Sequence, residues 1–160
     1  MTIRPAESSD ANAIWSILEP TIRAGETYTL PRAMDRETAL AYWFSPAHTV
    51  FVAEVEEEVL GTYYLRANQG GGGEHVGNCG YMTATNAVGR GVATAMCRHS
   101  MEYARSQGFL AMQFNFVIST NLPAIHLWRK FGFEQIGRVP NGFLHPTLGY
   151  VDALVMYRAL

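Results

Sequence analysis

The sequence predicts one α/β (α+β) domain with a mixed sheet, spanning residues 1–160. The first reason is composition, because 48% hydrophobic and 16% charged residues in a chain of 160 suit one globular domain with a substantial core. The second is that short segments of strand period alternate with longer segments of helical period, in the order β-α-α-β-β-β-α-β-α-β-β. The third is that no repeat and no low-complexity linker divides the chain.

Composition and charge also argue against several classes of protein. The net charge is −2 with both signs interspersed, and no basic stripe is present that would bind nucleic acid. No apolar run approaches the ~18 residues that cross a membrane, and the N-terminus lacks the apolar segment of a secretory signal. The only two cysteines, Cys79 and Cys97, favour a reduced, cytoplasmic protein. The five histidines are scattered, so no metal site is expected.

The N-terminal part of the chain is predicted as a strand followed by two helices. The strand is MTIRPA, and Ser9 or Asp10 can cap the helix that follows. Pro20 is expected to end or kink this helix, and Gly25 to stop any continuation. A second helix is expected over residues 35–45, before a proline.

Three strands are predicted in the middle of the chain. Residues 49–67 read as two strands joined by a tight acidic turn near Glu57, and residues 75–84 read as the third. Gly77 and Gly80 within the third strand indicate a bulge or a close approach of the backbone. Four consecutive glycines precede it. A hairpin loop explains them better than a phosphate-binding loop, because no helix start follows.

The C-terminal part is predicted as two helices and three strands. One helix begins at Val92, and a second spans residues 121–132, with a strand between them. The final two strands are FEQIGRV and GYVDALVMYRAL, and the apolar VDALVMY is expected to be able to pair across a homodimer. The strand between the helices alternates cleanly, which predicts one face made of Leu110, Met112, Phe114, Phe116 and Ile118 and another made of Ala111, Gln113, Asn115 and Val117.

The stretch TNAVGRGVATAM places Gly89, Gly91 and Ala93 at the start of a predicted helix. Small residues there let a phosphate approach the free backbone N–H groups, where the helix dipole is positive. A loop for nucleoside triphosphates would need Lys and then Ser or Thr after Gly91, where the chain has Val92 and Ala93. A dinucleotide fingerprint would need a third glycine where Thr94 stands. Alone, the loop indicates that a pyrophosphate binds there, but it does not identify the ligand that carries this group.

A second motif gives the loop a family resemblance. The segment NLPAIHLWRKFGF resembles the N-x-x-A-x-x-L-Y-x-x-x-G-F motif of the GNAT acetyltransferase superfamily, with Trp128 in place of the tyrosine. The loop VGRGVA resembles the pyrophosphate loop of that family, Q/R-x-x-G-x-G/A, with Val88 in place of Gln or Arg. The two motifs stand about thirty residues apart in the family's element order. The resemblance therefore covers the whole chain, most firmly from about Val50.

The resemblance implies a single GNAT-like domain with a central mixed, mostly antiparallel twisted sheet, splayed in its middle and flanked by about four helices. It implies acetyl-CoA as the donor, with the pantetheine arm between the strands that end near Thr83 and Ser119, and no metal. The residues implied to bind acetyl-CoA are Met82, Thr83, Val88, Gly89, Arg90, Gly91, Val92, Ala93, Thr94, Asn121 and Trp128.

The implied reaction is the direct attack of a neutral amine on the thioester in a ternary complex. Ordinary amines have a pKa near ~10, so the enzyme must either accept a proton or rely on the small neutral fraction. Asn78 stands near the position of a glutamate in many GNAT enzymes, and it can orient the amine but cannot take its proton. Tyr81 is a candidate acid, and Asn115 can bind a substrate carboxylate or carbonyl.

Three residues outside the motifs are candidates for the acceptor pocket. Glu26 and Tyr28 lie in the segment between the first two predicted helices, and His145 lies in FLHPTLGY before the last strand. Loops in such places commonly carry specificity. A carboxylate at Glu26 could hold a cationic substrate or act as a base through water.

A narrower pattern bears on the acceptor. The segments NCGYM, QFNFVISTN and PNGFLHPTLGYVDALVMY resemble the branch that contains the fungal proline-analogue N-acetyltransferases, and Asn78, Asn115 and Asn121 match it by spacing. This implies a small-molecule amine as acceptor, an amino acid or a proline-like imino acid. Two alternatives remain. One is acetylation of a protein N-terminus or lysine, and the other is a catalytically silent CoA-binding module, which the replaced glutamate and tyrosine would suit.

Overall fold

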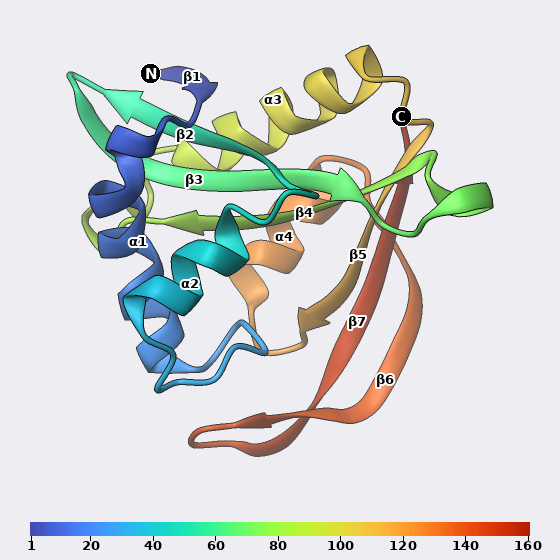
Figure 1. Cartoon of the computed structure of the whole chain (residues 1–160). Coiled ribbons are helices and arrows are strands. Elements are labelled where there is room, and N and C mark those ends of the chain that lie inside the picture. Colours follow the sequence, from blue (N-terminus) through green and yellow to red (C-terminus); the bar gives the residue numbers. More distant parts are fainter.

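The computed structural model describes residues 1–160, and its elements follow the predicted order (Figure 1). Three 3₁₀ turns, η1 (Ser8–Asp10), η2 (Gly71–Gly73) and η3 (Thr85–Ala87), accompany the larger elements. The helices are α1 (Ala11–Ala24), α2 (Arg36–Trp43), α3 (Val92–Ser106) and α4 (Leu122–Lys130). The strands are β1 (Thr2–Pro5), β2 (Thr49–Val55), β3 (Glu58–Ala67), β4 (Val76–Thr83), β5 (Ala111–Ile118), β6 (Glu134–His145) and β7 (Gly149–Ala159).

The strands form one seven-stranded sheet in the order β1-β2-β3-β4-β5-β7-β6. All neighbours are antiparallel except β4 and β5, which are parallel. The β4–β5 ladder consists only of the pairs Val76–Ala111 and Gly77–Met112, and the two strands diverge beyond it (Figure 1). This is the mixed, mostly antiparallel sheet splayed in its middle that the family resemblance implied.

Helices cover both faces of the sheet because side chains alternate along its strands. Val50 and Val52 of β2 pack with α1 and α2, whereas Phe51 and Ala53 of the same strand pack with α3 and α4 in the larger core cluster. Figure 1 shows α1 and α2 in front of the sheet and α3 behind it. The two cores hold the diverging strands from both sides, so the gap between β4 and β5 stays open within a packed domain. No helix is both long enough and apolar enough to cross a membrane.

Helix α1 differs from its prediction at two residues. Pro20 lies inside the helix, which continues to Ala24 and ends at Gly25 in the left-handed conformation, with φ 66°. Pro20 therefore does not end the helix, which was one of its two expected effects, and the expected stop at Gly25 is confirmed. Asp10 precedes the helix, but its side chain makes no capping hydrogen bond to α1. The carboxylate instead accepts the backbone N–H of Glu7 at 2.7 Å and pairs with Arg4.

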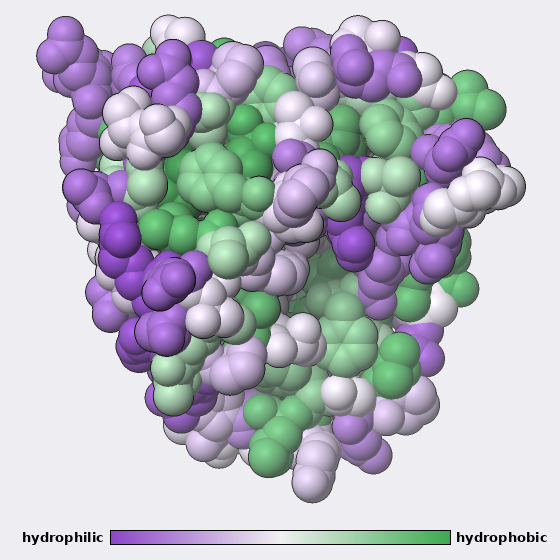
Figure 2. Space-filling view, in the orientation of Figure 1, coloured by the Kyte–Doolittle hydropathy of each residue, from purple (hydrophilic) through white to green (hydrophobic).

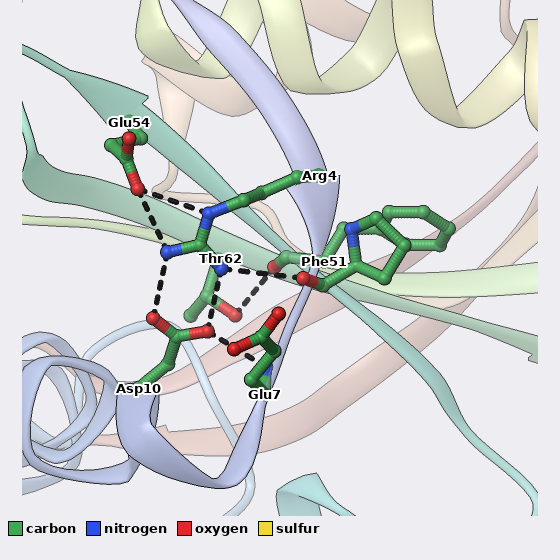
Figure 3. A network of polar contacts seen from close by, with 7 residues as sticks. Arg4, Glu7, Asp10, Phe51, Glu54 and Thr62 are labelled. Atoms are coloured by element: carbon green, nitrogen blue, oxygen red, sulfur yellow. Dashed lines mark hydrogen bonds and ion pairs between the residues drawn. The ribbon is translucent and has the colours of Figure 1, made fainter.

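Arg4 ties β1, η1 and β2 together through its guanidinium group (Figure 3). It donates to the two oxygens of Asp10 at 2.8 and 2.9 Å, and to Oε2 of Glu54 at 3.0 and 2.7 Å. The side chain of Asp10 is only 7% exposed. The hydrogen bonds from Arg4 hold the pKa of Asp10 below its usual value.

We expect Asp10→Asn to lower the free energy of unfolding at neutral pH by about 2 kcal/mol, because Arg4 loses a buried charge partner. The folded-state pKa of Asp10 is depressed, so its contribution is present above the unfolded pKa near ~4 and is lost as the pH falls through the folded value. Urea unfolding of the wild type and the variant at about pH 7 and about pH 3 measures this. The difference between the two proteins should shrink at the lower pH, and a difference that does not change would contradict the assignment.

The predicted alternation of β5 is interrupted by a bulge. Met112, Phe114 and Ile118, which were expected to share a face, are all buried, but Phe116 is exposed and Val117 is buried. The register with β7 shifts between Phe114 and Val117, so the faces of the strand exchange at this point. Leu110, expected on the same face as Met112 and Phe114, precedes the strand and is exposed.

The bulge expected in β4 is absent, because its register with β3 is unbroken from Gly77 to Thr83. The close approach that was the other explanation for its glycines is confirmed at Gly80. A Cβ atom there would lie 2.6 Å from Cε1 of Tyr64. Gly80 therefore makes room for an aromatic side chain of the neighbouring strand.

The C-terminal hairpin corrects two further expectations. Strand β6 does not stop near Val139 but continues past a register shift to His145. Strand β7 pairs with β5 on one side and with β6 on the other. The expectation that VDALVMY pairs across a homodimer is therefore wrong, because both edges of this strand are already used. The free edge on this side of the sheet belongs to β6.

Candidate active site

Two cavities meet at the gap between β4 and β5. The small cavity, of about 270 Å³, is lined by residues of β3, β4 and β5 together with Tyr28 and Tyr42. The large cavity, of about 630 Å³, is lined by the end of β4, the following loop and α4. In Figure 2 the surface is hollowed between α2 and the C-terminal strands, with apolar residues within the hollow and hydrophilic residues beside it. The residues that line both cavities are Thr27, Tyr28, Tyr81, Asn121, Ala124 and Trp128, so the two form one continuous cleft.

The loop before α3 forms a cradle of free backbone N–H groups beside the large cavity. Gly89 and Gly91 adopt φ of 78° and 80°, and Gly91 is the N-cap of α3. The lining of the large cavity contains Lys130 but no Asp or Glu. A positive helix end with free donors and no opposing carboxylate suits a pyrophosphate. The N–H groups that donate to no other group of the chain are those of Val88, Gly89, Gly91, Val92, Ala93 and Thr94.

The edge of β4 that faces the gap also carries free backbone groups. The N–H of Ala84 donates to Leu60 O and the N–H of Asn68 to Val76 O, so the even-numbered residues of β4 pair with β3. The odd-numbered Tyr81 and Thr83 therefore direct their N–H groups toward the gap, where β5 has diverged. The divergence of β5 frees these N–H groups, and no bulge in β4 is needed. Such donors can stabilise an oxyanion or hold an extended amide chain.

Asn78 and Asn115 lie in one network of amide side chains across the gap. Nδ2 of Asn78 donates to the carbonyl of Gln113 at 2.9 Å, a carbonyl on the strand that has diverged from β4. Nδ2 of Asn115 donates to Asn68 Oδ1 at 2.6 Å, and its Oδ1 accepts from Gln113 Nε2 at 3.0 Å. Oδ1 of Asn78 has no partner in the chain, and both asparagines line the small cavity. Asn78 can therefore accept one hydrogen bond from a bound amine.

Tyr81 and Trp128 form an aromatic wall between the two cavities. Their ring centroids are 5.0 Å apart, and Trp128 also packs at 4.7 Å on Phe114. The hydroxyl of Tyr81 makes a hydrogen bond of 2.7 Å with Ser100 Oγ of α3, in the core. Burial raises the pKa of this phenol well above its usual value. A role for Tyr81 as a proton donor is not supported by this geometry, whereas its backbone groups face the gap.

The three predicted acceptor-pocket residues have different positions. Tyr28 lines both cavities, and its hydroxyl donates to the carbonyl of Tyr81 at 2.8 Å. Glu26 is exposed and lines neither cavity. His145 is buried beside a third cavity, of about 570 Å³, between β6 and the loop after α1. Among the predicted cofactor residues, Arg90 is exposed and is absent from the lining of the large cavity.

Among the residues of the small cavity that sequence reasoning missed, three carry a phenol or a guanidinium group. Tyr42, Tyr64 and Arg66 all contribute to its wall, and the hydroxyls of the two tyrosines lie 3.2 Å apart. Tyr64 and Arg66 are two positions apart on β3, so their side chains share a face. The alternation of side chains along the predicted strand is therefore a signal that places Arg66 on the same face as Tyr64.

The cleft contains neither a reactive thiol nor a group of side chains that could hold a metal ion. Cys79 lines the small cavity, and burial raises its pKa to about 12, so the thiol is protonated at neutral pH. No three His, Cys, Asp or Glu side chains gather into a group that could hold a metal ion.

A splayed sheet beside a cradle of free N–H groups is the arrangement expected of an acyltransferase that uses CoA thioesters. The model of the Acetyltransferase (GNAT) family matches residues 12–133, and the chain belongs to this family. It is an acetyl-CoA-dependent acyltransferase.

Curated relatives and solved structures agree with this assignment. The N-acetyltransferase aca1 of Schizosaccharomyces pombe is 27% identical over 84% of this chain and 72% of its own length. The L-amino acid N-acetyltransferase AaaT of Escherichia coli is 28% identical over 99% of this chain and 97% of its own length. A GCN5-related N-acetyltransferase from Kribbella flavida is 39% identical and superposes with a TM-score of 0.94, covering 99% of this chain and 97% of that one.

Proposed function

We propose that this protein transfers the acetyl group of acetyl-CoA to the amino group of a small molecule, an amino acid or a proline-like imino acid, by direct attack in a ternary complex. The observation that carries the proposal is the junction of a cavity of about 270 Å³ with a larger cleft through six shared residues. The volume suits a small acceptor, and the junction lies where a thioester and an amine could meet. The name of the Escherichia coli relative supports an amino acid as the acceptor.

The donor half of the cleft is assigned to residues with free hydrogen-bond donors. The free N–H groups of Val88, Gly89 and residues 91–94 receive the pyrophosphate, and Lys130 adds a positive charge near it. The free edge of β4 at Tyr81 and Thr83 receives the pantetheine arm, and one of these N–H groups stabilises the oxyanion that develops on the thioester carbonyl. Bound acetyl-CoA supplies an activated acetyl group whose leaving thiolate has an ordinary pKa of about 8.5.

The acceptor half positions the amine but offers no side chain to deprotonate it. No Asp or Glu lines the small cavity, and burial raises the pKa of Tyr28, Tyr64 and Tyr81 above their usual values. The enzyme therefore binds the neutral fraction of the amine and orients it with Oδ1 of Asn78. The protonated thiol of Cys79 favours direct attack over an acetyl-cysteine intermediate.

The test is release of free CoA from acetyl-CoA in the presence of a panel of acceptors. The panel holds amino acids, cyclic imino acids, simple diamines and short peptides with free N-termini, and thiol release is followed at about pH 8.5. We expect turnover with amino or imino acids. Turnover with peptides alone would assign the protein to N-terminal or lysine acetylation. Binding of acetyl-CoA by calorimetry without turnover on any acceptor would mean a silent CoA-binding module.

A further inference from the structure

Arg66 is the only residue with a formal charge that lines the small cavity. It lies on β3 directly opposite Asn78 in the β3–β4 register. Its Nε is buried and has no hydrogen-bond partner, the one such side-chain atom in the structure. Arg66 takes part in no ion pair, and no carboxylate lines either cavity to neutralise it.

A buried guanidinium N–H without a partner is costly, because it has lost its water without gaining another acceptor. Arg66 acts electrostatically on two titratable side chains, Tyr64 and His48. The centroids of their stacked rings are 3.9 Å apart. Burial raises the pKa of Tyr64 and lowers that of His48, so both are neutral near pH 7. The partner that satisfies Arg66 is therefore expected to enter the cavity from outside the chain, and it is expected to be an anion.

We propose that Arg66 binds the carboxylate of the acceptor, so that the enzyme selects α-amino and α-imino acids over amines that lack this group. The proposal rests on the proposed function and adds its specificity-determining residue. Arginine binds carboxylates through two parallel N–H···O bonds, and its free Nε can supply one of them.

The register of β3 and β4 also favours an amine close to the carboxylate. Residues directly opposite in an antiparallel pair have Cα atoms about 5.5 Å apart or less, and their side chains share one face. Arg66 and Asn78 are such a pair, and both line the small cavity. A carboxylate on Arg66 and an amine on Oδ1 of Asn78 are then separated by a short span, which an α-amino acid provides with a single carbon. Diamines lack the anion and bring a second positive charge toward Arg66.

The experiment compares several amino and imino acids, proline included, with their primary amides. The amine of such an amide has a pKa of about 8, below that of the free amino acid, so kcat/KM is expressed per neutral amine. The wild type should prefer the acid by about 100-fold, since a hydrogen-bonded ion pair is lost with the amide. Arg66→Met should remove most of this preference by slowing the acids alone, and Arg66→Lys should restore part of it. The matched control is Arg98→Met, an exposed arginine of α3 that should change neither rate.

Three outcomes would overturn the proposal. The first is a wild type that acetylates acids and amides equally, which leaves the proposed function intact. The second is an Arg66→Met variant that loses activity on both equally, which would mean a structural role. If neither substrate is acetylated, the proposed function fails, and calorimetric titration of proline and prolinamide into the CoA complex tests the role of Arg66 separately. Binding of proline that depends on Arg66 would support the proposal. The third overturning outcome is that no such binding is seen.

Discussion

Gly91→Val should raise the Kd for acetyl-CoA by about 100-fold, equivalent to about 2.7 kcal/mol. Gly91 holds φ at 80° at the start of α3, where its N–H and those of residues 92–94 have no partner in the chain. A β-branched side chain disfavours this conformation and stands where a pyrophosphate would approach. Losing one or two charge-assisted hydrogen bonds accounts for an effect of this size. Isothermal titration with acetyl-CoA measures it.

The matched control is Gly108→Val. Gly108 also has a positive φ, of 86°, and an added Cβ would meet nothing, as at Gly91, but it follows α3 at the end remote from the cleft. The two substitutions should cost similar stability, so a thermal melt separates strain from ligand binding. Only the Gly91 variant should lose affinity. Equal affinity in both variants would argue against the pyrophosphate cradle.

Asn78→Ala should lower kcat by about 100-fold while the Kd for acetyl-CoA changes by less than about threefold. The side chain presents an unpaired Oδ1 to the small cavity, and a misplaced amine can cost two orders of magnitude in rate. The substitution also leaves the Gln113 carbonyl without its donor, which should cost about 1 kcal/mol of stability. Steady-state kinetics at saturating acetyl-CoA, with a separate binding titration, distinguish the two effects.

Asn12→Ala provides the comparison for Asn78→Ala. Asn12 lies on α1 outside both cavities and accepts one hydrogen bond from Arg36 at 2.8 Å. This variant should keep its kcat, because it also removes an asparagine hydrogen bond but touches neither cavity. If Asn78→Ala weakens acetyl-CoA binding as much as it slows turnover, Asn78 is a structural link between β4 and β5 and not a group that orients the amine.

The order of elements and the turn at the start of α3 could be predicted because they depend on local features. Helix α3 is a segment of helical period with small residues before it and Gly108 after it. The side chain of Asn121 caps α4 by accepting the N–H of Ala124, which is only three residues away in the sequence. Family motifs added the splay of the sheet, which no periodicity indicates. These features need only residues close in sequence, so a single chain is enough to read them.

The errors arise where distant residues decide the structure. Asp10 pairs with Arg4 and so does not cap α1, and the bulge at Phe116 depends on the register with β7. Arg66 was overlooked for the same reason. Its importance comes from an unsatisfied Nε and from the residue across the sheet, and neither can be read from the strand itself. The prediction of Glu26 depends on its charge alone, and this residue lies outside both cavities.

The short ladder between β4 and β5 has a consequence for how the domain responds to its donor. The strands β4 and β5 are paired through only two residue pairs, so few backbone hydrogen bonds resist local opening at the gap, and packing in the shared core supplies most of the link between the two halves of the sheet. A ligand whose amides lie along the bare edge of β4 acts as an added strand within the sheet. Donor binding would then couple the two halves into one cooperative unit, with slower amide exchange along that edge. The acceptor would then react in a donor complex whose two half-sheets open less readily than those of the free enzyme.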